Sequence, residues 1–139
     1  MVRISKCAMV FALITILSVP AIVRAADLSL STLAGTWYNI GPNTSGVVTI
    51  IITDAGGIQI QAFSACSPDP CDWGVVNGTA YGRNESSVRA TTFLANYDTA
   101  NGESVMTGSR SGPNLRVDVF TRAVDGRAAT VWAGVFTRE

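Results

Sequence analysis

The side chains that carry most acid–base and metal chemistry in proteins are sparse in this sequence, which contains no histidine. Ser-His-Asp and Cys-His catalysis and the usual zinc sites require an imidazole and are therefore excluded. The carboxylates number ten, and several lie in turn signals, where aspartate is common for backbone reasons. Two of them could still converge as a hydrolase pair, although Asp72 is better explained as a loop cap. We expect no metal and no cofactor.

Residues 1–25 carry the features of a secretory signal peptide. Arg3 and Lys6 give a positive start, an apolar stretch follows, and small residues stand at the −3 and −1 positions before a cleavage point after Ala25. The apolar stretch is shorter than the ~20 residues that a membrane-spanning helix needs. We therefore expect one domain over 26–139, in a secreted or periplasmic protein.

The charge of that domain restricts its partners. The whole chain has ten basic and ten acidic side chains, and three of the basic ones lie in residues 1–25. Residues 26–139 therefore have a net charge of about −3, without the basic face that nucleic-acid binding usually requires. They also hold no apolar stretch long enough to cross a membrane, so neither nucleic acid nor membrane is an expected partner.

Two cysteines remain after the predicted cleavage, Cys66 and Cys71, with Pro68 and Pro70 between them. Export would place them where disulfides persist, and five residues of separation allow pairing within one loop. The alternative is two free thiols. A metal site is less consistent with the sequence, because it has no second cysteine pair and no histidine.

The domain has the composition and turn spacing of a β-protein, rich in threonine, valine, isoleucine and glycine. Turn signals such as Asn101-Gly102 and Asp125-Gly126, which type I′ hairpins prefer, predict short connections between the strands. The connection through the two cysteines is expected to be the longest. Neighbouring strands should therefore pair, and eight of them can close into an antiparallel up-and-down barrel. The expected strands are 34–40, 46–53, 57–64, 73–82, 87–96, 103–109, 114–123 and 128–137.

Two of these strands raise questions about what they face. Residues 47–52 are apolar on both faces, so the face turned away from the core belongs either to an ordinary surface or to a subunit interface. In residues 73–81, one face carries Asn77, Thr79 and Tyr81. If that face points inward, its polar groups need partners such as a ligand, and the alternative is that it faces solvent.

The segment Leu-Ala-Gly-Thr-Trp-Tyr-Asn at 33–39 resembles the first strand of avidins and carries the Gly-x-Trp start that avidins share with lipocalins. Near its C-terminus the chain has Phe136-Thr137-Arg138, which is similar to the Phe-Thr-basic sequence at the end of the last avidin strand. This resemblance implies a calycin-like barrel whose base is closed by Arg138 stacked on Trp37, a cation–π contact. The alternative is a core tryptophan with an unrelated surface arginine.

A longer pattern resembles a family of secreted bacterial domains that carry the signature Cys-x-Pro-x-x-Cys-Asp-Trp-Gly between their third and fourth strands. Here it covers residues 66–74. Trp37 and Asn39, Asp125-Gly126-Arg127 and Phe136-Thr137-Arg138 agree with the family as well. Ala65 departs from the glycine that is frequent in the family. This resemblance implies the fold and the export, and no particular activity.

The avidin resemblance also implies a ligand site at the open end of the barrel. Asn39 matches a position that hydrogen-bonds the biotin ureido oxygen, and Ser45 is placed to be a second donor. The acid that avidins carry two residues before the final Phe-Thr is Gly134 here, and the tryptophans that wall the biotin pocket have no clear counterparts. The resemblance does not extend to a complete biotin site.

We therefore expect a secreted, non-catalytic binding protein that takes a small molecule or a peptide at the open barrel end. The expected ligand-binding residues are Asn39, Ser45, Asn77, Thr79 and Tyr81. Two alternatives stay open at this point: a protease inhibitor or interaction module with a filled interior, acting through a terminus or the Cys66–Cys71 loop, and a carboxylate hydrolase. A homo-oligomer is compatible with each of them.

Overall fold

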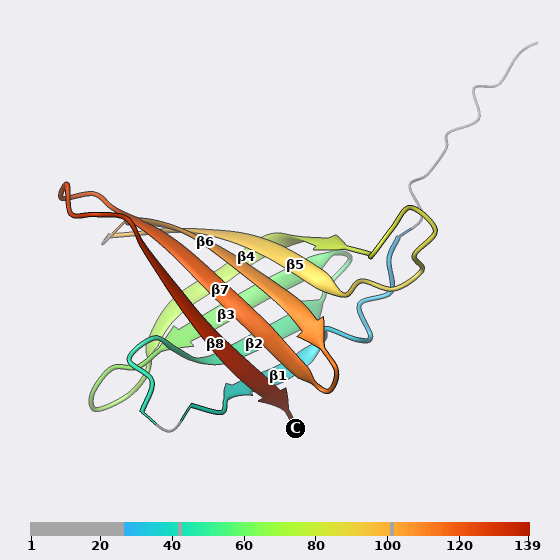
Figure 1. Ribbon diagram of the computed structural model, residues 1–139, viewed down its shortest axis with the longest axis horizontal. Coiled ribbons are helices and arrows are strands. Elements are labelled where there is room, and N and C mark those ends of the chain that lie inside the picture. Colours follow the sequence, from blue (N-terminus) through green and yellow to red (C-terminus); the bar gives the residue numbers. More distant parts are fainter. Residues whose placement is uncertain (1–26, 42, 101) are drawn as a thin grey trace, which may run out of the picture.

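The protein, in a computed structural model, is described over residues 27–41, 43–100 and 102–139. The predicted signal peptide, residues 1–25, lies outside the described residues. Within them the chain forms strands and no α-helix (Figure 1). The strands are β1 (Gly35–Asn39), β2 (Val47–Asp54), β3 (Ile58–Ser64), β4 (Cys71–Tyr81), β5 (Thr92–Thr99), β6 (Gly102–Ser111), β7 (Asn114–Ala123) and β8 (Thr130–Arg138).

Each strand pairs antiparallel with the next, and β8 pairs back onto β1, so the sheet closes into a barrel. Closure leaves no strand with an unpaired edge, which an open sheet of this length would expose. The predicted eight-stranded up-and-down barrel is therefore confirmed. Within the described residues, no helix is long and apolar enough to cross a membrane.

The connection between β4 and β5 differs from the prediction. We expected a strand from residue 87, but β5 begins at Thr92, which makes 82–91, and not the cysteine connection, the longest. Backbone hydrogen bonds tie this loop to the N-terminal segment: Ser29 N–H donates to Val88 O, and Ala90 N–H donates to Ser29 O. Residues near 88 thus extend along that segment instead of joining β6.

The connection between β7 and β8 is also wider than a type I′ hairpin. It covers residues 124–129, and Asp125 does not take the positive φ that this turn needs at both central positions. Only Gly126 does, with φ of 79°. Asp125 instead accepts a hydrogen bond from the Arg127 N–H at 3.2 Å, so the side chain supports a broader loop.

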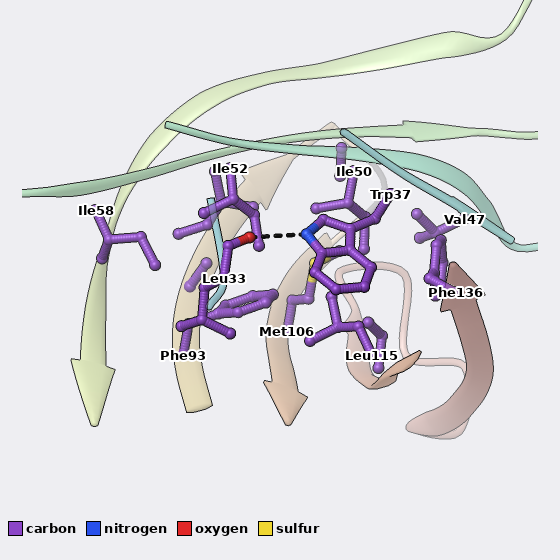
Figure 2. Packing of buried hydrophobic residues seen from close by; sticks show 14 of the residues in the cluster. Leu33, Trp37, Val47, Ile50, Ile52, Ile58, Phe93, Met106, Leu115 and Phe136 are labelled. Carbon is purple, nitrogen blue, oxygen red and sulfur yellow. Dashed lines mark hydrogen bonds between the residues drawn. The ribbon is translucent and has the colours of Figure 1, made fainter. Parts of the chain in front are cut away.

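The core lies inside the barrel, and Figure 2 shows the part of it that packs around Trp37 and Leu33, at the end that the N-terminal segment covers. Trp37 is fully buried there, and its indole Nε1–H donates to Leu33 O at 2.7 Å. Arg138 lies over the ring, with Cζ 5.3 Å from the centroid, which confirms the predicted closure. Arg110 also contacts the ring, at 5.0 Å, a partner that the sequence did not reveal. We call this end the closed end.

Strand β2 is apolar on its inner face, where Val47, Ile50 and Ile52 are buried. Its outer face is less apolar than expected, because Ile51 stands there between Thr49 and Thr53 and is half-buried. Whether a second chain covers that outer face stays a prediction. The register shifts between residues 47 and 49, so a bulge marks the start of this strand.

Candidate functional site

The opposite end of the barrel, which we call the mouth, contains the cysteine loop and lies on the left in Figure 1. Cys66 and Cys71 form a disulfide with a Cα–Cα distance of 5.5 Å, as predicted. A cavity of about 530 Å³ opens beside it, within the range typical of small-molecule sites. Its lining comes from β3 to β7: Ser64, Cys66, Cys71, Asp72, Trp73, Asp98, Thr99, Ala100, Ser104 and Thr121.

A bulge in β4 turns Trp73 toward this cavity. Gln61 pairs with Val75 and Phe63 pairs with Asp72, so two residues of β4 stand opposite one residue of β3. One of the two is Gly74, whose φ of 82° lies in the left-handed region that glycine tolerates best. The bulge thereby changes which side chains of β4 face the interior.

Hydrogen bonds hold the bulge in place from both sides. The Asp72 carboxylate accepts from Gly74 N–H at 2.8 Å and from Gln61 Nε2 at 2.9 Å. The predicted cap role of Asp72 agrees with these contacts. On the inner side, Trp73 Nε1–H donates to Ser64 Oγ at 3.0 Å. The orientation of the indole is therefore fixed before any ligand arrives.

Tyr97 supports the wall beneath Trp73. Its ring meets the indole edge-on, with centroids 5.4 Å apart and planes at 78°. Its hydroxyl donates to Ile60 O at 2.9 Å in a buried position. Burial raises the pKa of the Tyr97 phenol above its ordinary value, and the negative charge of Asp72 raises it further. The phenol is thus a neutral, rigid support for the Trp73 ring, behind the cavity lining.

Hydroxyl groups face this aromatic wall from β6 and β7. Ser104 is only 5% exposed, and its Oγ lies 2.9 Å from Thr121 Oγ1. Two hydroxyls have two protons to donate, and the bond between them uses one. One hydroxyl of the pair therefore remains free to donate a hydrogen bond to a ligand oxygen in the cavity.

The rim of the cavity is acidic. Asp72 and Asp98 are exposed there, and no arginine belongs to the described lining. Neither carboxylate forms an ion pair within the described residues, but the Arg122–Glu103 pair lies beside Asp98, because Glu103 is the cross-strand partner of Asp98. The rim thus carries two carboxylates without an ion-pair partner, which disfavour an anionic ligand there.

Two of the predicted ligand-binding residues, Asn39 and Ser45, do lie at the mouth, but outside this lining. The Asn39 amide is used within the protein: Nδ2 donates to Val47 O at 2.9 Å, and Oδ1 accepts from Gly41 N–H at 2.7 Å. Ser45 is exposed in the connection after β1. The contacts of Asn39 favour a role in shaping this connection.

Trp132 fills the barrel interior next to Asn39. A side chain at Gly46 or at Gly134 would collide with its indole, so the two glycines make room for the ring. Trp132 also meets Phe136 edge-on, with centroids 6.3 Å apart. Gly134, at the position where avidins carry an acid, thus accommodates a tryptophan in this protein.

The other three predicted residues, Asn77, Thr79 and Tyr81, lie on the outer face of β4. All three are exposed, and Asn77 Oδ1 accepts from Gln59 Nε2 across the strand pair at 3.3 Å. The inward-facing alternative is therefore wrong, and the solvent-facing one holds. Because the bulge shifts the alternation by one residue, the side facing the interior beyond it consists of Val76, Gly78 and Ala80.

The sequence contained one signal for this site. An isolated glycine inside a strand pattern, here Gly74, indicates a bulge, and a bulge after Trp73 redirects the tryptophan relative to the rest of β4. Ser64, Ser104 and Thr121 had no such signal, since hydroxyl residues are ordinary in strands.

A second cavity, also about 530 Å³, lies at the closed end between residues 27–30 and the β2–β3 turn. Asp27, Asp54 and Thr79 are its polar side chains, and glycines, Ala80 and three aliphatic side chains form the rest of its lining. Three polar side chains thus line this cavity, whereas six line the one at the mouth. In the described residues, no group of three potential metal ligands (His, Cys, Asp or Glu) is found. The mouth is therefore the stronger candidate site.

The fold and this cavity define a class: a closed eight-stranded antiparallel barrel with an aromatic and hydroxyl-lined mouth. No family model, curated protein or solved structure matches the chain significantly. Membership in the Cys-Asp-Trp-Gly signature family, and a relation to avidins and lipocalins, stay predictions from the sequence.

Proposed function

We propose that the protein is a secreted or periplasmic, non-catalytic binding protein that takes a small molecule, or one side chain of a peptide, in the mouth cavity. The observation that carries this proposal is the convergence of a fixed indole, Trp73, with the Ser104–Thr121 hydroxyl pair in one cavity. An apolar or aromatic wall with a few placed polar groups is typical of small-molecule sites. The disulfide is consistent with export.

The charge at the mouth narrows the class of ligand. Asp72 and Asp98 disfavour an anion at the rim and favour a molecule rich in hydroxyl or ammonium donors. Trp73 offers a ring for the apolar face of such a molecule. A polyol or an amine meets these requirements better than a carboxylate or a phosphate.

The same two carboxylates argue against a hydrolase. Asp72 accepts hydrogen bonds at both oxygens from local donors, and Asp98 is exposed to solvent. A carboxylic acid that protonates a leaving group usually sits in an apolar pocket that keeps it neutral. Neither side chain has such surroundings, which supports binding without turnover.

The test is a thermal-shift screen of the exported protein against neutral polyols, amines, organic anions and biotin, after native mass spectrometry of protein from its source. A ligand at one hundred times its Kd should stabilise the fold by about 2.7 kcal/mol. Ser104→Ala and Thr121→Val should reduce that shift, whereas Thr79→Val, outside the mouth, should preserve it. If no compound shifts the midpoint, or the shift survives both mouth variants, the proposal fails.

A second candidate function is an interaction module that acts through the cysteine loop. Every residue from 65 to 72 is exposed, and the disulfide joins the two ends of this loop. The loop could enter a protease cleft as the secreted-inhibitor alternative requires. Inhibition of a serine or cysteine protease that disappears with Asp69→Ala, but not with Ser104→Ala, would favour this function.

A further inference from the structure

The exposed apolar side chains of this barrel are concentrated on one face. Of the ten large hydrophobic residues that are exposed in the described chain, seven belong to β1, β6, β7 and β8 or to the connections after β1 and β7. Exposed apolar side chains that lie next to one another mark interaction sites on soluble proteins. The seven are Tyr38, Ile40, Val105, Phe120, Val124, Val131 and Val135.

A cross-strand row forms the centre of this face. Val105 pairs with Phe120, and Phe120 pairs with Val131, so the three side chains stand in line across β6, β7 and β8. Phe120 is 49% exposed and Val131 63% exposed. A shallow groove of about 520 Å³ runs along the row, bordered by Ala129 and Thr130. A side chain as large as phenylalanine would bury much of its own surface there.

Charged residues flank Phe120 on its own strand with opposite signs. Arg122 lies two residues beyond it and Asp118 two residues before it, on the same outer face. Each charge has a partner in its own chain, Glu103 for Arg122 and Arg116 for Asp118. On β7 itself, a half-turn about Phe120 exchanges the positive position with the negative one, so this strand is self-complementary in charge.

We propose that this face binds a second copy of the chain in a two-fold dimer, with β7 of each copy antiparallel across the interface and the two Phe120 rings at the axis. This arrangement places Arg122 opposite Asp118 of the second copy, twice, and buries both central rows against each other. A two-fold contact uses the same patch on both copies, which this patch allows. Binding of an unrelated protein or of an apolar surface would not require charges of opposite sign at symmetric positions on either side of Phe120.

The first experiment measures the mass of the exported protein by analytical ultracentrifugation across a dilution series. We expect a dimer that dissociates at least tenfold more readily in Phe120→Asp. Val75→Asp, which changes a similarly exposed apolar residue on β4, outside the proposed interface, should leave the dimer intact. A wild-type monomer at every concentration, or a dimer unaffected by Phe120→Asp, overturns the proposal.

A second experiment tests the geometry without depending on a destabilising change. Phe120→Cys should form a disulfide-linked dimer under oxidation, because the axis brings the two positions together, whereas Val135→Cys, away from the axis, should not. Arg122→Asp and Asp118→Arg should each weaken the dimer, and the double variant should recover it. A dimer that lacks the Phe120→Cys cross-link, or that the double variant fails to restore, overturns the two-fold arrangement.

Discussion

Tyr97 stabilises the fold through a buried hydrogen bond and also supports the Trp73 ring, and the contribution of its phenol to stability should depend on pH. Its hydroxyl donates to Ile60 O from a position that is 2% exposed, and its ring supports Trp73 at the mouth. Because burial and the charge of Asp72 raise the pKa of this phenol, the folded protein holds the neutral form more strongly than the unfolded chain does. The phenol therefore contributes stability below the unfolded pKa of about 10, and loses it as the pH rises further.

Tyr97→Phe should lower the free energy of unfolding at neutral pH by about 0.5–1.5 kcal/mol, the net value of a typical hydrogen bond. Above pH of about 10 the difference between the two proteins should shrink, because only the wild type must retain an uncharged phenol. Urea denaturation at pH 7 and pH 10.5 measures both values. Tyr38→Phe, at an exposed position, is the control. Parallel loss of stability in wild type and Tyr97→Phe would contradict the explanation.

At the scale of the element, the bulge in β4 decides what the mouth contains. Gly74 has φ of 82° and open space around it, so an added Cβ would meet no atom but would strain the backbone. Gly74→Ala should destabilise the protein by about 1–2 kcal/mol, the cost of a left-handed conformation for an L-residue.

Gly74→Asn is the matched variant, because asparagine tolerates the left-handed region better than alanine. It should recover part of the loss measured for Gly74→Ala by the urea midpoint. A shift in tryptophan emission should accompany the alanine variant if Trp73 leaves its bond to Ser64. Equal midpoints for wild type and Gly74→Ala would show that the bulge has no need of glycine.

The bulge also explains how far the sequence could predict the site. Strict alternation along 73–81 placed Trp73 and Asn77 on one face, and this holds only for an uninterrupted strand. The extra residue at the bulge puts Trp73 inside and Asn77 outside. Convergence of Ser64, Ser104 and Thr121 depends on the register of five strands, which no local pattern specifies.

The fold itself was easier to predict at the scale of the whole molecule. Eight strands with short connections leave adjacent pairing as the simplest topology, and the Gly-x-Trp start with Arg138 at the chain end indicated where the barrel closes. The predicted start of β5 was wrong, because the residues before Thr92 form backbone hydrogen bonds with the N-terminal segment, which is distant in sequence. Long-range contacts of this kind leave no periodic trace.

The eight strand pairs that close the barrel, which we call its seams, differ in how many residues they join. Three residue pairs join β1 to β8, whereas ten join β6 to β7. Arg138 supports the short seam at the closed end: its guanidinium stacks on the buried Trp37, and it donates to Ser31 O at 3.2 Å and to Ala34 O at 2.9 Å. The N-terminal turn, the first strand and the last strand are thus joined by one side chain.

Removing that side chain should open the barrel locally before it unfolds as a whole. In Arg138→Ala, amide hydrogen exchange should accelerate in β1 and β8, while β6 and β7 exchange at rates close to those of the wild type, because local openings follow the least-supported elements. Arg116→Ala, an arginine of the outer face paired with Asp118, should leave the β1–β8 rates unchanged. Hydrogen-exchange mass spectrometry resolves these segments. Uniform acceleration across all eight strands would mean that the barrel opens only cooperatively and that Arg138 supports no particular seam.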